Sequence, residues 1–387
     1  MVISKKVQDM QPSGIRMFFD MVLGMREVIS LGVGEPDFVT PWVIREAGIY
    51  ALEEGFTSYT SNKGLYKLRL SISRYLKNRF SLDYDPDEEI LITVGVSEGL
   101  DLALRALLNP NDKVIIPSPS YVSYGPLTEL AGGVPIYIDT RKTNFKLTPE
   151  ILEKNILKGT KAIIFNYPNN PTGVSYQKQE LGELKKVILK HKIICISDEI
   201  YGDLTYDFEH TPFSVLPQAK PYTIYLNGFS KAYAMTGWRI GFACGPKEII
   251  SAMTKIHQYT IMCVSTSSQF AACEALFSAK KNVENMFKEY KRRREFLTRR
   301  LKEIGLDFVK PQGAFYIFAS IKNTGFYSLD FAKRLLEEKK VAVVPGVAFG
   351  KNYDDYVRIS YATNFENLKV ALERMEEFVK RRCCLKM

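Results

Sequence analysis

Short apolar runs recur along the middle of the chain, and segments with helical spacing separate most of them. The runs are EEILITV (88–94), DKVIIP (112–117), GVPIYID (133–139), KAIIFN (161–166), KIICIS (192–197), YTIYLN (222–227) and RIGFAC (239–244). Several are continuous rather than alternating, which is typical of strands buried on both faces of a mainly parallel sheet. Their alternation with helices predicts an α/β fold.

The segment SEGLDLALRALL (97–108) shows the helical spacing most clearly. One helical face collects its apolar side chains, namely Leu100, Ala103, Leu104, Leu107 and Leu108. Asn109 and Pro110 follow at once, and we expect them to end the helix.

The pattern changes in the C-terminal part of the chain. A helix rich in Lys and Arg is predicted over 285–303, followed by the strands GAFYIFA (313–319), VAVVPG (341–346) and YVRISYA (356–362). The last helix is expected to begin with a capping box from Thr363 to Glu366. This order of elements predicts a second, smaller α+β domain.

Composition and charge narrow the class of protein. The 387 residues favour two domains, and 46% hydrophobic with 25% charged residues is ordinary for a globular protein. The net charge of +10 gathers at KRRREFLTRRLK (291–302). A nucleic-acid surface is one interpretation; apolar residues within the segment favour a solvated helix face instead.

The sequence argues against a membrane protein, a secreted protein and a metal-dependent protein. No apolar run is long enough to span a bilayer, and the N-terminal MVISKKVQDM has no apolar signal region, so we expect a cytosolic protein. The three histidines, His191, His210 and His257, are far apart in the sequence. We therefore expect no zinc or other metal site and no Ser-His-Asp triad.

Polar groups follow four of the predicted strands, where open parallel sheets bind ligands. Gly95-Val96-Ser97 begins a helix and suits an anion, although a plain turn with Ser97 as N-cap is the simpler interpretation. NYPNNPTG (166–173) forms a sharp loop that could aim one asparagine into a cleft or serve only as a turn. Asp198, in SDEIYGDL (197–204), follows an apolar strand and needs a cationic or hydrogen-bonding partner if buried.

The fourth strand end is SKAYAMTGWRIG (230–241), which sets one lysine and one arginine in a small, apolar run. Lys231 is a candidate nucleophilic amine for Schiff-base chemistry, and Arg239 could fork onto a phosphate. The neighbouring alanines, glycine and tryptophan make a poor solvated surface. Together the four strand ends suit a ligand with a phosphate, a ring nitrogen, a ring oxygen and a carbonyl group. Pyridoxal phosphate carries these four functional groups.

Six motifs, taken in order and spacing, resemble one family over essentially the whole chain. They are LGVGEPDF (31–38), YTSNKGLYKLR (59–69), NYPNNPTGV (166–174), SDEIYGDL (197–204), NGFSKAYAMTGWRIGF (227–242) and YVRISYA (356–362). The chain resembles the class I/II aminotransferases of the aspartate aminotransferase fold type, which use pyridoxal phosphate. This resemblance implies a large domain (46–285) with a mainly parallel sheet in a three-layer sandwich, and a small α+β domain built from 1–45 and 286–387.

The resemblance also implies a role for each candidate residue of the cofactor site. Lys231 would form the Schiff base and later shuttle a proton, Asp198 would keep the pyridine nitrogen protonated, and Asn170 and Tyr201 would bond the ring oxygen. Tyr121 would stack on the ring. The phosphate would be held by Arg239, Ser230, the Gly95 turn with the amides of Val96 and Ser97, and Tyr59 of a neighbouring subunit.

The substrate side of the site is implied in the same way. Arg358 would clamp the substrate α-carboxylate, helped by Asn170 and the backbone at Gly34. The shared Tyr59 implies a homodimer with shared active sites, acting on an amino acid and a 2-oxo acid.

Two departures from the family pattern bear on cofactor and substrate. Gly228 stands where many relatives carry a serine, which leaves Ser230 to serve the phosphate. Ser97 stands where aspartate-preferring relatives often carry a lysine. GVSEGLDLALRAL and KIHQYTIMC resemble enzymes that act on N-acetyl-LL-diaminopimelate.

We therefore expect an aminotransferase whose donor is aromatic, aspartate-like or N-acetyl-LL-diaminopimelate and whose acceptor is 2-oxoglutarate. A C–S lyase of the same fold is the alternative, because it would need the same lysine, aspartate and arginine. A basic nucleic-acid-binding protein is the rival from another class.

Overall fold

A seven-stranded sheet forms the larger part of the molecule. The computed structural model describes residues 2–10, 12, 14, 25 and 27–383. The strand order is β2-β8-β7-β6-β5-β3-β4, and β8 runs antiparallel to its two neighbours. The remaining pairs are parallel. The strands are β2 (Ile90–Thr93), β3 (Lys113–Ser118), β4 (Val134–Asp139), β5 (Thr160–Asn166), β6 (Ile194–Asp198), β7 (Thr223–Gly228) and β8 (Gly241–Cys244).

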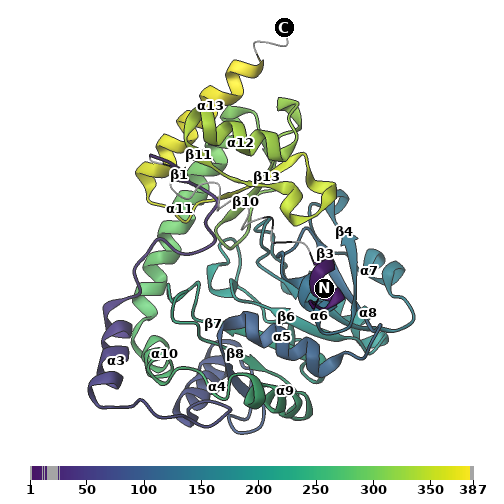
Figure 1. Cartoon of the computed structure of the whole chain (residues 1–387), viewed down its shortest axis with the longest axis vertical. Coiled ribbons are helices and arrows are strands. Elements are labelled where there is room, and N and C mark those ends of the chain that lie inside the picture. The colour runs from purple at the N-terminus through teal and green to yellow at the C-terminus, as the bar shows by residue number, and fades with distance from the viewer. Residues whose placement is uncertain (1, 11, 13, 15–24, 26, 384–387) are drawn as a thin grey trace.

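Helices pack around this sheet, and Figure 1 shows them in its lower half. The helices are α1 (Lys5–Asp9), α3 (Trp42–Glu53), α4 (Tyr66–Phe80), α5 (Gly95–Leu107), α6 (Tyr124–Leu130), α7 (Pro149–Asn155), α8 (Lys178–Lys190), α9 (Lys247–Thr260) and α10 (Thr266–Ser278). Helix α5 packs on β7, β8 and α9, while α10 packs on α3 and α4. The predicted α/β architecture with a mainly parallel sheet is therefore confirmed.

A second, smaller sheet lies at the other end of the molecule. Its antiparallel order is β12-β13-β10-β9, with β9 (Asp307–Phe308), β10 (Tyr316–Ser320), β12 (Val344–Pro345) and β13 (Tyr356–Ser360). Helices α11 (Lys280–Ile304), α12 (Ser328–Lys339) and α13 (Phe365–Cys383) accompany it. The long α11 contacts both α10 and α13, and Figure 1 shows it running from the larger part to the smaller one.

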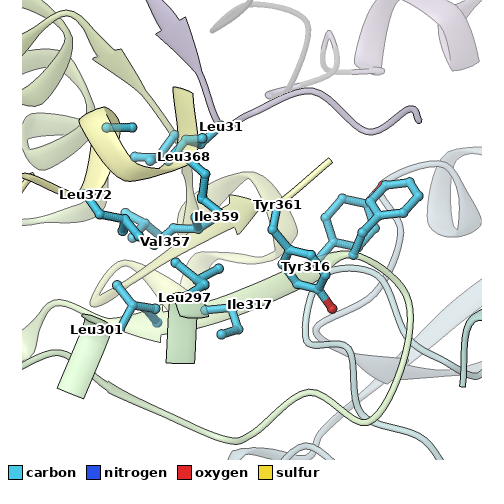
Figure 2. Close-up of a cluster of buried hydrophobic side chains, with 14 of the residues drawn as sticks. Leu31, Leu297, Leu301, Tyr316, Ile317, Val357, Ile359, Tyr361, Leu368 and Leu372 are labelled. Carbon is cyan, nitrogen blue, oxygen red and sulfur yellow. The ribbon is translucent and has the colours of Figure 1, made fainter. Parts of the chain in front are cut away.

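The N-terminal segment joins the smaller part. Strand β1 (Ile29–Ser30) pairs in parallel with β11 (Val341–Ala342). Leu31 is buried in the same core as α11, α13, β10 and β13, and Figure 2 shows it beside Leu368 and Ile359. Chain segments some three hundred residues apart thus share one apolar core.

Two sequence expectations about the smaller part are wrong in detail. VAVVPG is not one strand, because β11 pairs with β1 whereas β12 pairs with β13. The last helix does not begin with a Thr363 capping box; it begins at Phe365, and the Asn364 side chain accepts a hydrogen bond from the amide of Asn367 at 2.8 Å. Asn is as good an N-cap as Thr, and it lies one residue closer to the first turn.

The basic segment of α11 is not simply a solvated face. Arg293 and Arg294 are buried, with 4% and 1% of their surface exposed. Arg293 pairs with Asp37 at 2.8 Å, and Arg294 pairs with Asp207 at 2.7 Å. These arginines face the body of the protein because α11 packs against both parts of it. Among the described residues, no helix is long and apolar enough to cross a membrane.

Candidate active site

The carboxyl ends of β5 and β6 bring two of the predicted polar segments together. Asn166 ends β5, and its side-chain amide donates to the carbonyl oxygen of Asp198, the last residue of β6, at 2.9 Å. The Asn166 side-chain oxygen accepts a hydrogen bond from the amide of Asn170 at 3.0 Å. The loop that contains Asn170 is therefore fixed beside Asp198, as expected for parallel strands whose ends meet at one edge.

Asp198 is a buried carboxyl group with two hydrogen-bond donors. The hydroxyl of Tyr124 donates to Oδ2 at 2.7 Å, and the amide of Ile200 donates to Oδ1 at 3.3 Å. Burial raises the pKa of Asp198 to about 6, although both donors act in the opposite direction. The ionised carboxylate would therefore be stabilised by a cation placed against it.

Lys231 places its amine among backbone and aromatic groups. Its Nζ donates to the carbonyl oxygen of Gly34 at 2.6 Å and lies 5.8 Å from the centre of the Tyr201 ring. Burial lowers the pKa of Lys231 to about 8; Glu35 opposes this shift, and the cation of Arg358 reinforces it. A lysine in this state has a sizeable neutral, nucleophilic fraction near neutral pH.

Arg358 is a buried cation with spare hydrogen-bonding capacity. It is 2% exposed, and its two terminal nitrogens donate to the side-chain oxygen of Asn170 at 3.0 Å and to the carbonyl of Gly32 at 2.5 Å. Its Nε has no partner among the described residues. Neither of these two partners is a carboxylate, and burial lowers the pKa of Arg358. Such a group would be stabilised strongly by a bound anion.

Tyr316, on β10, connects the arginine to the lysine. The Arg358 guanidinium lies 4.5 Å from the centre of the Tyr316 ring, and the Tyr316 hydroxyl lies 2.9 Å from that of Tyr201. A side chain at Gly34 would place its Cβ 2.9 Å from the Tyr316 hydroxyl. The backbone at Gly34 therefore approaches the site as closely as only glycine allows.

The start of α5 faces Arg239. Gly95 opens the helix with φ +71°, and a Cβ there would lie 3.0 Å from the Arg239 guanidinium. Ser97 is therefore inside the first turn and not its N-cap, and Glu98 accepts the hydrogen bond from the amide of Val94 instead. The amides of Val96 and Ser97 belong to this first turn, where a helix supplies no internal acceptor for its N–H groups.

The remaining predicted residues take different places. Ser230 is buried next to Lys231 in the chain, and the ring of Tyr121 lies 5.6 Å from that of Tyr124 in an edge-to-face arrangement. Tyr59 is 80% exposed. Within the described chain, the site thus contains one buried guanidinium (Arg358), one half-buried amine (Lys231) and one buried carboxyl group (Asp198). Arg239 faces the start of α5 from an exposed position, and Tyr59 lies on the surface.

Sequence reasoning missed two tyrosines that touch the site. Tyr124 stands three residues after Tyr121 in PSYVSY and begins α6, whereas Tyr121 lies before the helix. Tyr316 stands in the apolar strand motif GAFYIFA, where it looks like ordinary core. The available signal was the hydroxyl of Tyr316 within a strand predicted to be buried. A buried tyrosine hydroxyl usually has a hydrogen-bond partner, which would have indicated a polar neighbour there.

Comparisons with known proteins agree with this geometry. The family described as "Aminotransferase class I and II" matches residues 26–375. The aspartate aminotransferase of Pyrococcus abyssi is 45% identical over 99% of both chains. A Bacillus subtilis protein named "Probable N-acetyl-LL-diaminopimelate aminotransferase" is 41% identical over 98% of this chain and 96% of its own length. The solved aromatic aminotransferase of Pyrococcus horikoshii is 43% identical, with a TM-score of 0.90 over 95% of this chain and 99% of its own.

Proposed function

The chain belongs to the class I and II aminotransferases, enzymes that depend on pyridoxal phosphate, and on this basis we propose its reaction. It transfers the amino group of an L-amino acid to a 2-oxo acid, with 2-oxoglutarate as the expected acceptor. The donor is aromatic, aspartate-like or N-acetyl-LL-diaminopimelate. Relatives named for each of these donors are similar to this chain to nearly the same degree.

Arg358 is the observation that carries this proposal for the substrate. A guanidinium that is 2% exposed and lacks a partner for its Nε calls for a small anion with two oxygens. The α-carboxylate shared by amino acids and 2-oxo acids has this form. Asn170 already holds the guanidinium from one side and would orient it toward that carboxylate.

The residues of the site fit pyridoxal phosphate. When bound, this cofactor supplies an aldehyde that condenses with amines and a ring that accepts electrons from the substrate. Asp198 would hold a proton on the ring nitrogen, Asn170 and Tyr201 would donate to the ring oxygen, and Tyr121 would cover the ring face. Arg239, Ser230 and the amides at Gly95, Val96 and Ser97 would bind the phosphate.

Lys231 is proposed as the group that moves the proton in the reaction. Its lowered pKa gives a neutral Nζ that can take a proton from the substrate Cα and deliver it to the cofactor carbon bonded to the same nitrogen. Tyr201, with its ring 5.8 Å from Nζ, borders this path. The carbonyl of Gly34 accepts a hydrogen bond from this amine at 2.6 Å.

A half-reaction titration tests this function. The protein loaded with pyridoxal phosphate is mixed with aspartate, glutamate, tyrosine, phenylalanine or N-acetyl-LL-diaminopimelate, without any oxo acid, and its absorption is recorded. Conversion to the pyridoxamine form supports transamination, and the fastest donor defines the substrate class. Release of pyruvate and ammonia from cystathionine, with no conversion by any amino acid, would replace the proposal with the C–S lyase.

We also propose that the enzyme is a homodimer whose sites are shared through Tyr59. Large apolar side chains are exposed on α3, on the segment after it, and on α9 and α10, including Trp42, Tyr50, Phe56, Tyr259 and Phe277. The Thr266 hydroxyl at the start of α10 donates to the carbonyl of Ser58, the neighbour of Tyr59, at 2.9 Å. An exposed apolar surface of this kind typically marks a protein interface. A cavity of about 690 Å³, lined by Phe38, Thr236, Arg239 and Ser268 among others, opens beside Arg239.

Mixed dimers test the sharing of Tyr59. Subunits with Tyr59→Ala are mixed with subunits that carry Lys231→Ala, and the two are allowed to exchange. If Tyr59 acts across the interface, each mixed dimer regains one intact site and activity rises above that of either parent. If activity does not rise although mass spectrometry detects mixed dimers, Tyr59 does not serve the neighbouring site.

A further inference from the structure

Tyr124 touches the carboxyl group that is proposed to face the cofactor ring. It is the first residue of α6, and 1% of its surface is exposed. Its hydroxyl donates to Oδ2 of Asp198 at 2.7 Å across 74 positions in the sequence. A short hydrogen bond to an ionised acceptor is among the stronger interactions in a protein interior.

This hydrogen bond determines how the carboxyl group of Asp198 is oriented. The Ile200 amide contacts Oδ1 at 3.3 Å, which is a long hydrogen bond from the adjoining backbone. The hydrogen bond from Tyr124, at 2.7 Å, is therefore the shorter of the two. Without it, the long contact from Ile200 would be the remaining hydrogen bond, among the described residues, that restrains rotation of the carboxyl group about its Cβ–Cγ bond.

The position of Tyr124 is itself well defined by its surroundings. The Thr128 hydroxyl donates to the Tyr124 carbonyl at 2.8 Å, and the ring of Tyr121 packs edge-on at 5.6 Å. A Cβ on Gly125 would meet the Tyr137 hydroxyl of β4 at 1.8 Å, so α6 lies directly against the sheet. The hydroxyl of Tyr124 is therefore presented to Asp198 by a rigid element.

The charged neighbours of Asp198 act in opposite directions. The carboxylate of Glu199 disfavours a second negative charge, whereas the cation of Lys231 favours it. Burial also disfavours the charge and has the largest effect. A hydrogen bond donated to the ionised form is what counters these costs.

We propose that Tyr124 is a positioning residue that keeps Asp198 ionised and directed at the protonated ring nitrogen of pyridoxal phosphate. The inference rests on the proposed role of Asp198. Tyr124 itself does not touch the reacting atoms and acts through the carboxylate. Loss of its hydroxyl moves the shared proton from the ring nitrogen toward Asp198 and weakens the hold on the cofactor.

The test observes the ring nitrogen directly. The enzyme is loaded with pyridoxal phosphate labelled with ¹⁵N in the ring, and the nitrogen chemical shift is followed from pH 6 to pH 9. In Tyr124→Phe we expect a shift toward the unprotonated value, and a dissociation constant for pyridoxamine phosphate that is higher by about tenfold. Pyridoxamine phosphate is used because its binding does not require a bond to Lys231.

Matched variants separate positioning from folding. Thr128→Val removes a buried hydroxyl from the same helix without touching Asp198, and it should keep the wild-type chemical shift. In an Asp198→Asn background, Tyr124→Phe should have no further effect on the chemical shift or on affinity. If Tyr124→Phe does not fold, Tyr124→Met is a second variant without the hydroxyl.

Two outcomes overturn the inference and are distinguishable. If Asp198→Asn moves the nitrogen shift and Tyr124→Phe does not, Tyr124 has no positioning role although Asp198 keeps its own. If neither variant moves it, Asp198 does not face the ring nitrogen, and the proposed role of both residues fails.

Discussion

The hydroxyl groups of Tyr201 and Tyr316 lie 2.9 Å apart and connect the two parts of the molecule at the site. Tyr201 follows β6 of the large sheet, whereas Tyr316 begins β10 of the small one. Burial raises the pKa of both, so both hydroxyls stay protonated at neutral pH. Lys231 lies near one of these rings and Arg358 near the other. A change that displaces either tyrosine should therefore affect amine and carboxylate binding together.

Gly34→Ala is expected to lower kcat/KM by roughly ten- to a hundredfold, since small displacements of catalytic groups have effects of that size. The added Cβ would lie 2.9 Å from the Tyr316 hydroxyl, which must then move. Steady-state kinetics with the best donor measures the change. Gly182→Ala is the matched control, because nothing lies within 4 Å of a Cβ there. Equal kcat/KM values for both variants would show that the Gly34 backbone is not part of the site.

Lys231→Ala is expected to abolish turnover and the covalent attachment of pyridoxal phosphate, because no other amine among the candidate residues can replace it. Borohydride reduction followed by peptide mass spectrometry locates the cofactor on the chain. Lys192→Ala, on the loop before β6, is a control that should leave attachment and turnover intact. Transamination at the normal rate by Lys231→Ala would contradict the assignment.

The rate at which the cofactor-free protein captures pyridoxal phosphate is expected to rise with pH and level off above about pH 8. Only the neutral amine attacks the aldehyde, and burial lowers the pKa of Lys231 from 10.5 to about 8. The lowered pKa also affects folding stability. Between about pH 8 and 10.5, Lys231 binds more protons in the unfolded chain than in the folded one. Its contribution to stability therefore increases with pH there. A capture rate that keeps rising tenfold per pH unit beyond pH 9 would indicate an ordinary lysine.

Arg358→Ala is expected to weaken binding of the amino acid substrate by on the order of 2–4 kcal/mol, because a charge-assisted bidentate pair is lost. The concentration dependence of the half-reaction gives the apparent affinity. Arg358→Lys should fall between wild type and Ala, since it keeps the charge without the fork. Arg105→Ala removes an arginine from the exposed pair with Asp101 and should leave affinity unchanged. Wild-type affinity of Arg358→Ala for every amino acid would remove Arg358 from the site.

The seven strands of the large sheet could be predicted because each is a short apolar run with its own local signal. Segments such as KAIIFN and KIICIS match β5 and β6 to within two residues. The strand ends of a parallel sheet meet at one edge, so Asp198 and Asn170 could also be placed near each other before the structure was known. These inferences need only local pattern and one topological rule.

Other features depend on contacts between distant segments, which a single sequence does not reveal. Tyr124 reaches Asp198 across 74 positions, and Tyr201 reaches Tyr316 across 115. VAVVPG looks like one strand because nothing local marks where its pairing changes from β1 to β13. The burial of Arg294 depends on Asp207, which lies 87 positions away. The proposed domain limits and the roles of the site residues remain predictions.

The Arg294–Asp207 pair gives the clearest prediction for stability. Arg294 is 1% exposed and forms two hydrogen bonds with Asp207, at 2.7 and 2.8 Å, and one with the carbonyl of Pro311 at 2.9 Å. Asp207→Asn would leave a buried guanidinium without its counter-charge. We expect the free energy of unfolding to fall by about 3 kcal/mol, at the low end for a buried pair because Asp207 is partly exposed.

Urea denaturation measures this loss, and its pH dependence adds a second check. The hydrogen bonds from Arg294 hold the pKa of Asp207 below its usual range, so the pair stabilises the fold above the ordinary carboxyl pKa. This contribution is lost as the pH falls through the lowered pKa, and Asp207→Asn should approach wild-type stability there. Glu183→Gln breaks an exposed pair with Lys186 and should change stability by less than about 1 kcal/mol. Equal losses for the two variants would mean that the buried pair contributes no more than a surface one.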